Sequence, residues 1–190
     1  MKTFLFYFMS FTWGIIMSVI GSLVTLVLLI CGKKPKRYRC AWYFNLGESW
    51  GGVNFGPCFI VSKTNTISIP HEYGHGIQNC ILGPLFPFII AIPSLIRAGY
   101  RKSYFLGKSD IVDGLVIFPV FYGVFIIVAN LFYVSVLWLW IVFAIMVYIT
   151  SLSIWLVYIE GARYTETKYP KYDDAWFEGL ATKIGTKFNK

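Results

Sequence analysis

The stretch PHEYGHGIQNCIL, residues 70–82, contains the only two histidines of the 190-residue chain, His71 and His75. Pro70 suits the first position of a helix, and Gly83 begins a Gly-Pro pair that interrupts one. We therefore expect a helix over this stretch. Two histidines four residues apart lie on one face of a helix, one turn apart, where both imidazoles can bind the same metal ion.

The five residues that follow the proline, His71-Glu72-Tyr73-Gly74-His75, match the pattern H-E-x-x-H, which is typical of zinc hydrolases. In such a site both histidines hold Zn2+, and the glutamate takes a proton from the water. We therefore expect His71 and His75 to be metal ligands and Glu72 to be the catalytic base. The alternative is that a pattern with two free positions has arisen by chance.

The composition is typical of an integral membrane protein. Hydrophobic residues make up 57% of the chain and charged residues 14%, and the mean hydropathy is +0.63. Soluble proteins have about 25% charged residues. The net charge is +8, but no basic helix with interleaved aromatic residues lies outside the apolar runs, which excludes nucleic-acid binding. The composition predicts a lipid bilayer as partner and leaves the oligomeric state open.

Two long uncharged runs predict membrane-spanning helices. Residues 4–30 exceed the roughly 20 residues that a transmembrane helix needs. Residues 114–159 are 46 consecutive uncharged residues, which predicts a transmembrane hairpin over 111–158. Basic residues cluster at 33–39, whereas only Lys2 precedes the first run. The positive-inside rule then places the N-terminus outside and the active site on the cytoplasmic side of a bacterial cytoplasmic membrane.

The remaining segments are shorter and more mixed. Residues 41–68 combine aromatic residues with glycines, and residues 59–61 read as a short strand. This strand is either an edge that pairs with an extended peptide or part of an interfacial loop. Residues 70–98 join the histidine-bearing helix to an apolar segment that glycine and proline interrupt, which predicts a re-entrant or interfacial path. Residues 173–187 predict an amphipathic helix.

Together these segments predict an all-α membrane protein with a single domain over residues 1–190. The expected architecture has about three transmembrane helices and a broken re-entrant or interfacial helix that carries the metal motif. A short β segment precedes that helix, and an amphipathic helix ends the chain.

A catalytic zinc has three protein ligands and one water, and the chain has no third histidine. Glu178 is the preferred third ligand, because apolar neighbours allow its helix to pack on the zinc helix; the alternative is a solvated acid. Asp173 and Asp174 either orient an imidazole through its second nitrogen or cap the tail helix. Cys80 lies five residues after His75, off the metal-binding face.

The order of these features is similar to that of the integral-membrane zinc metalloendopeptidases of the heat-shock and CAAX-prenyl-processing kind. Shared are the H-E-x-x-H helix, an apolar hairpin and then Glu-Gly-Leu-Ala at residues 178–181. The resemblance implies zinc on the two histidines and Glu178, with Glu72 as general base. Thr182 stands where that family has an aspartate that hydrogen-bonds a ligand histidine.

A second resemblance covers residues 52–97 and 176–179, which look like a set of small uncharacterised bacterial membrane proteins. It implies no activity.

The function predicted from these residues is that of a membrane-embedded zinc-dependent hydrolase, and among hydrolases a peptidase. Its substrate would be a peptide or membrane protein near the cytoplasmic interface. One alternative is a zinc-binding membrane protein without catalysis, whose site has a structural or partner-binding role. Another is a small membrane component without a metal, in which the histidines serve helix packing.

Overall fold

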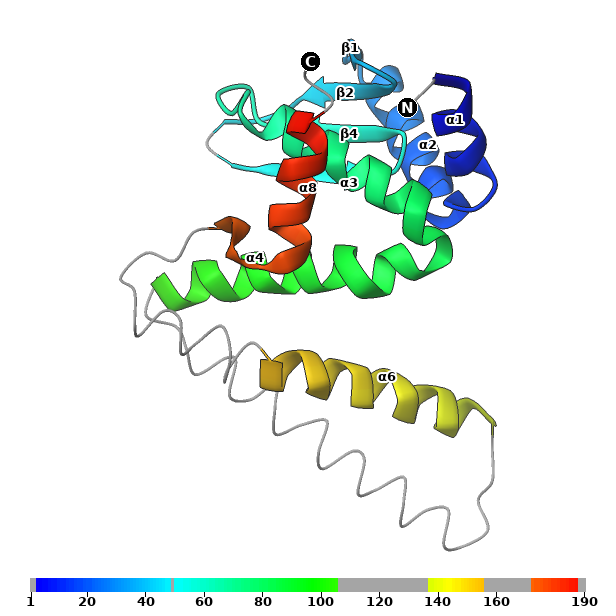
Figure 1. Cartoon of the computed structure of the whole chain (residues 1–190), viewed down its shortest axis with the longest axis vertical. Coiled ribbons are helices and arrows are strands. Elements are labelled where there is room, and N and C mark those ends of the chain that lie inside the picture. The colour runs from blue at the N-terminus through cyan, green and yellow to red at the C-terminus, as the bar shows by residue number, and fades with distance from the viewer. Residues whose placement is uncertain (1–2, 49, 106–136, 156–171, 188–190) are drawn as a thin grey trace, which may run out of the picture. The chain divides into compact units, whose positions relative to one another are not determined.

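The computed structural model describes the chain in four stretches, which are residues 3–48, 50–105, 137–155 and 172–187 (Figure 1). The chain divides into two compact units, Met1–Ile92 with Lys171–Lys190, and Pro93–Pro170. The second unit includes α6 (Leu137–Ile154) and most of α4 (Ile92–Phe105). All the predicted metal ligands belong to the first unit.

A four-stranded mixed sheet lies in the first unit. Its strands are β1 (Lys36–Tyr38), β2 (Ala41–Asn45), β3 (Gly52–Phe55) and β4 (Cys58–Val61), in the spatial order β1-β2-β4-β3. β2 and β4 are parallel, and the other two neighbouring pairs are antiparallel. The expected all-α fold class is therefore wrong, because the described chain is a mixed α/β structure.

Most of the strands are not predicted from the sequence, because each is only three to five residues long. Such short runs give too few positions for the alternation of apolar and polar residues to be recognised. The turns between them depend on residues with positive φ, of which Gly56 (φ +74°) links β3 to β4. The sequence predicts only residues 59–61 as a strand, and these lie in β4.

Helices cover both faces of the sheet. Phe59 and Val61 of β4 belong to the hydrophobic core formed with α3 (Ser68–Leu82). Successive side chains of a strand point to opposite faces, and Cys58 of the same strand lies against α2 (Ile15–Ile30). All four residues of β4 are buried in consequence.

The predicted transmembrane helix over 4–30 is broken into two helices, α1 (Thr3–Phe11) and α2, which are bent by 100°. The break includes Gly14, whose carbonyl oxygen accepts a hydrogen bond of 3.3 Å from Asn79 Nδ2 of α3. A Cβ at this glycine would collide with the Asn79 amide. Hydropathy does not reveal the break, because the three residues between the helices carry no charge.

Among the described residues, no single helix is both long enough and apolar enough to cross a membrane. Two bent pairs meet the same criteria of length and composition only together: α1 with α2, and Ser68–Leu85 with Pro87–Gly99. The hairpin predicted over 111–158 lies largely outside the described residues. For the described part of the chain, the expectation of about three transmembrane helices is therefore wrong.

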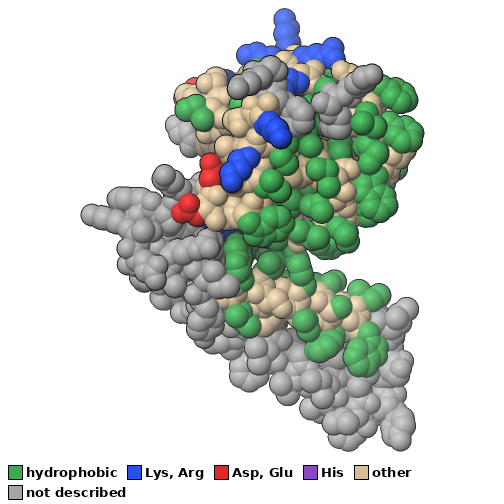
Figure 2. Space-filling view, in the orientation of Figure 1, with side chains coloured by type: hydrophobic (Ala, Val, Ile, Leu, Met, Phe, Trp, Pro, Cys, Tyr) green, Lys and Arg blue, Asp and Glu red, His purple; other side chains and the backbone are tan. Residues whose placement is uncertain are grey.

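The surface over α1 and α2 is nevertheless strongly apolar. Hydrophobic side chains gather there on the right of the upper part of Figure 2, and basic side chains lie at its top. The exposed fractions of Phe4, Leu23 and Leu26 are 80%, 59% and 55%. Exposed apolar patches of this kind mark surfaces that contact a membrane or another protein.

The helix predicted over 173–187 is α8 (Trp176–Lys187), preceded by a 3₁₀ turn at Tyr172–Asp174. It lies along α3 (Figure 1). Glycines allow the two backbones to approach closely, because a Cβ at Gly74 would overlap the backbone of Ala181. A Cβ at Gly185 would likewise overlap the backbone oxygen of Pro70. This close approach brings α8 beside the two histidines of α3.

Candidate metal centre

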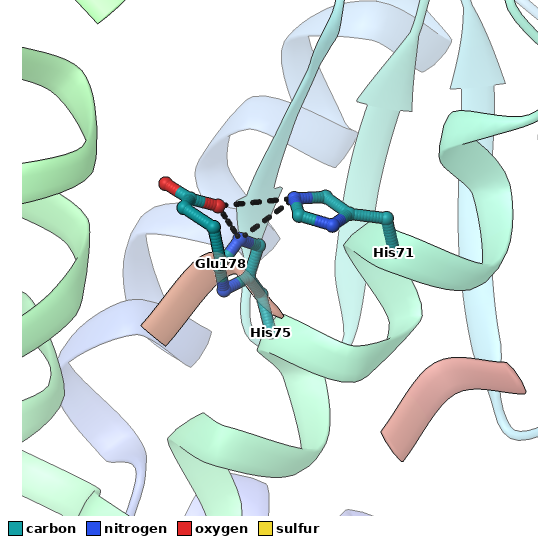
Figure 3. Close-up of side chains that lie close together, drawn as sticks. All are labelled: His71, His75 and Glu178. Atoms are coloured by element: carbon teal, nitrogen blue, oxygen red, sulfur yellow. Dashed lines mark hydrogen bonds and ion pairs between the residues drawn. The ribbon is translucent and has the colours of Figure 1, made fainter. Parts of the chain in front are cut away.

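His71, His75 and Glu178 meet where α3 and α8 lie side by side (Figure 3). The Nε2 atoms of the two imidazoles are 3.2 Å apart. Glu178 Oε2 lies 3.1 Å from each of these nitrogens. The three atoms thus form a nearly equilateral triangle. Ligands at about 2.0–2.1 Å from a tetrahedral zinc are roughly 3.3 Å apart, so the triangle matches the spacing of three zinc ligands.

The outer nitrogen of His71 is held by a chain of two hydrogen bonds. Its Nδ1 lies 2.8 Å from Thr182 Oγ1. The Thr182 hydroxyl donates its single proton to Asp173 Oδ1 at 3.0 Å, so its oxygen accepts the bond from His71 Nδ1–H. This assigns the imidazole proton to Nδ1 and leaves a lone pair on Nε2 that points to the other two ligands.

His75 is oriented in the same way by an amide. Its Nδ1 lies 2.7 Å from Gln78 Oε1, and Gln78 Nε2 donates to the backbone oxygen of Phe177 at 2.9 Å. The bond to Phe177 fixes which end of the amide faces the imidazole, so Gln78 Oε1 accepts the proton of His75 Nδ1. The Nε2 atom of His75 is again left with a lone pair.

With both imidazoles neutral and protonated at Nδ1, lone pairs of the two Nε2 atoms and of Glu178 Oε2 face one point. The side chains of His71, His75 and Glu178 are 14%, 8% and 0% exposed, so water does not screen them well. A proton on the Nε2 atom of one imidazole would form a hydrogen bond to another atom of the triangle. The remaining two acceptor atoms would still face each other without a proton between them. One divalent cation at the centre would satisfy all three lone pairs at once.

The electrostatic environment of the site favours positive charge. Burial, the largest single influence, lowers the pKa of His75, yet Glu178 and Glu72 raise it above its ordinary value on balance. A positive charge on this imidazole, or beside it, is thus favoured even though the site is shielded from solvent.

Glu72, the predicted base, lies beside the three ligands and is 5% exposed. Burial raises the pKa of its carboxyl group to about 6, while His75 and His71 act in the opposite direction. The carboxylate packs against Gly52 of β3, where a Cβ would stand 2.5 Å from Glu72 Oε1. Asn54 of the same strand donates to the backbone oxygen of Glu72 at 2.8 Å. β3 thus positions Glu72.

Other residues singled out from the sequence have structural roles. Tyr73 is 2% exposed and packs in the core against Phe6 and Tyr38. Cys80 is also in that core, where its Sγ lies 3.3 Å from Ser10 Oγ. Neither residue belongs to the ligand group.

Two supporting residues were missing from the sequence-based site. Gln78 stands one turn after His75, and this position of an amide relative to the histidine is a signal present in the sequence. Gly52 gave no signal, because its role depends on the pairing of β3 with β4.

Thr182→Val is expected to weaken metal binding by about 10–100-fold, as loss of such supporting hydrogen bonds does. Valine keeps the branched shape of threonine, so the packing of α8 is preserved while His71 Nδ1 loses its acceptor. Metal affinity measured by competition with a chromogenic chelator checks this. Thr186→Val, one turn further along α8, is the matched control, because Thr186 bonds only its own helix. Equal affinities in the two variants would contradict the role given to Thr182.

Comparison of the chain with protein-family models, with curated proteins and with solved structures finds no match.

Proposed function

We propose that the protein is a zinc-dependent hydrolase and that it acts on peptides. The observation that carries the proposal is the convergence of His71 Nε2, His75 Nε2 and Glu178 Oε2 beside the buried carboxylate of Glu72. Among the described residues the group contains three ligands. Three protein ligands with an open fourth position are typical of catalytic zinc, whereas structural zinc has four protein ligands.

The residues of the site fit the hydrolysis of an amide. Zinc bound there would act as a Lewis acid toward a water molecule and toward the carbonyl oxygen of the substrate. Glu72 accepts the proton that the water loses as its oxygen bonds to the carbonyl carbon. Glu72 then gives this proton to the nitrogen, and the C–N bond breaks. A base with a pKa raised toward neutral pH is suited to both transfers.

The choice of a peptide as substrate is supported by β3. Among the described strands, β3 is at one end of the sheet order and has β4 as its single neighbour. It also holds Glu72 through Gly52 and Asn54. An extended peptide that pairs with the edge of β3 would lie alongside the base, with backbone hydrogen bonds providing affinity.

A location at the cytoplasmic face of a membrane is also proposed. The exposed apolar surface of α1 and α2 supports it, as do the basic residues that follow α2. Anionic lipids of the cytoplasmic leaflet attract such residues.

Elemental analysis of the purified full-length protein, together with a cleavage assay, tests the function. We expect about one zinc per chain, cleavage of an unfolded protein such as casein or of membrane peptides, loss of cleavage with a chelator and recovery with added zinc. A bound metal without cleavage of any peptide would favour the non-catalytic alternative. A protein that purifies and refolds without affinity for zinc would overturn both readings.

A further inference from the structure

A second candidate site is a groove of about 390 Å³ between α1, α2 and the sheet. None of the metal ligands lines it. Its volume falls in the range of small-molecule pockets, about 300–1,000 Å³. Its lining is largely apolar and includes Tyr7, Thr25, Leu26, Leu29, Trp42 and Cys58.

The groove opens on the apolar surface of the protein. Leu26 and Leu29 of α2 line it and are 55% and 47% exposed, whereas Cys58 lines it from the sheet and is 4% exposed. The wall of the groove is therefore continuous with the hydrophobic surface seen over α1 and α2 in Figure 2. A ligand could enter from that surface without passing through water.

Positive charge lies at the sheet side of the groove. Trp42 forms part of the lining, and the guanidinium carbon of Arg37 is 5.8 Å from the centre of its ring. Arg37 is exposed, and Lys33, Lys34 and Lys36 precede it in an exposed run. An apolar groove with a cationic rim is complementary to a molecule with an alkyl chain and an anionic head.

We propose that this groove binds one acyl chain of an anionic phospholipid, with the lipid phosphate at Arg37. The apolar lining is complementary to the acyl chain, and the Arg37 guanidinium is complementary to the negative charge of the phosphate. The continuity of the groove with the apolar surface of α1 and α2 favours a lipid of the bilayer as the ligand. The lipid-binding proposal depends on the proposed membrane location but not on zinc or on hydrolysis. Lipid binding can therefore fail while zinc-dependent hydrolysis is confirmed, and the reverse is also true.

Photo-crosslinking tests the proposal. Full-length protein in nanodiscs is irradiated with phosphatidylglycerol that carries a diazirine in one acyl chain, and the labelled residues are identified by mass spectrometry. We expect labels to concentrate on the groove, at Thr25, Trp42 and Cys58. Labels distributed evenly along the exposed residues of α1 and α2 would show ordinary contact with bilayer lipids and would overturn the proposal.

Two pairs of variants test binding of the acyl chain and binding of the lipid headgroup separately. Thr25→Phe fills the groove and is expected to abolish most labelling of Cys58, whereas Leu23→Phe, on the exposed face of the same helix, preserves it. Arg37→Gln is expected to lower the preference for phosphatidylglycerol over phosphatidylcholine by about fivefold, the effect of one basic residue at a lipid surface. Lys34→Gln, in the same run but not over Trp42, is its control.

Alkylation of thiols provides a measurement that does not need a variant. Cys31 is exposed at the end of α2, whereas Cys58 lines the groove. Phosphatidylglycerol is expected to slow the reaction of Cys58 with a small maleimide and to leave that of Cys31 unchanged. If phosphatidylglycerol affects both thiols equally, or if phosphatidylcholine protects Cys58 to the same degree, the proposed site is wrong.

Discussion

Glu178→Gln is expected to leave the purified protein without its metal ion while the fold remains intact. The substitution keeps the size of a side chain that is fully buried and removes the charge that balances a divalent cation. Because a direct ligand is lost, the fall in metal affinity should exceed the roughly 10–100-fold that the loss of a supporting hydrogen bond causes. Metal content at a fixed zinc concentration and a competition titration measure it.

Thermal unfolding distinguishes a lost metal from a damaged fold. A ligand that binds the folded state stabilises it by about 4 kcal/mol when its concentration is 1,000 times its dissociation constant. The wild-type protein should therefore unfold at a higher temperature with zinc than with a chelator, and Glu178→Gln should show no such difference. In the chelator the variant should be at least as stable as the wild type, because the glutamine amide can donate to the imidazole nitrogens.

Glu48→Gln is the matched control, since Glu48 is exposed and removing its charge changes the net charge by the same amount. It should retain both the metal and the zinc-dependent stability. Full zinc content in Glu178→Gln would mean that another residue is the third ligand.

Glu72→Gln is expected to reduce peptide hydrolysis by about 10²–10⁴-fold, the usual contribution of a general acid–base residue. Zinc content should stay at the wild-type level, because Glu72 is not one of the three ligands. Glutamine has nearly the same shape, so the contact with Gly52 and the hydrogen bond from Asn54 to the backbone are preserved. Turnover and metal content measured on the same preparation give the result.

The pair of variants carries more information than either alone. Glu178→Gln should lose activity together with the metal, and excess zinc should restore part of both. Glu72→Gln should lose activity with the metal present, and zinc should restore nothing. Wild-type turnover in Glu72→Gln would exclude this residue as the base, even if the metal site is correct.

Much of the candidate centre follows from local chemistry. The spacing of His71 and His75 predicts a shared ligand face on any helix, and the lack of a third histidine directs attention to an acidic residue such as Glu178. The supporting hydrogen bonds are different, because they depend on the way α8 packs on α3. The sequence predicts Asp173 as a direct partner of an imidazole or as a cap, whereas in the structure it contacts His71 through Thr182.

The fold was harder to predict, because the apolar composition favoured transmembrane helices over the short strands. Apolar residues that cover a small sheet and apolar residues that face lipid give the same hydropathy, and the helix break at Gly14 contains no charge. β1 and β2 contain arginine and aromatic residues in short runs whose pairing is non-local. The parallel pairing of β2 with β4 also places β3 at the end of the sheet order, and no short window of sequence encodes that arrangement.

The separation of the ligands along the chain has a consequence for biosynthesis. Glu178 follows His75 by 103 residues, so a nascent chain on the ribosome carries both histidines long before it carries the acid that completes the triangle. Until α8 has been translated and has docked through Gly185 and Ala181, the candidate metal centre would lack its third ligand. Docking of α8 would thus complete the candidate metal centre only after the segment between the two helices has been synthesised.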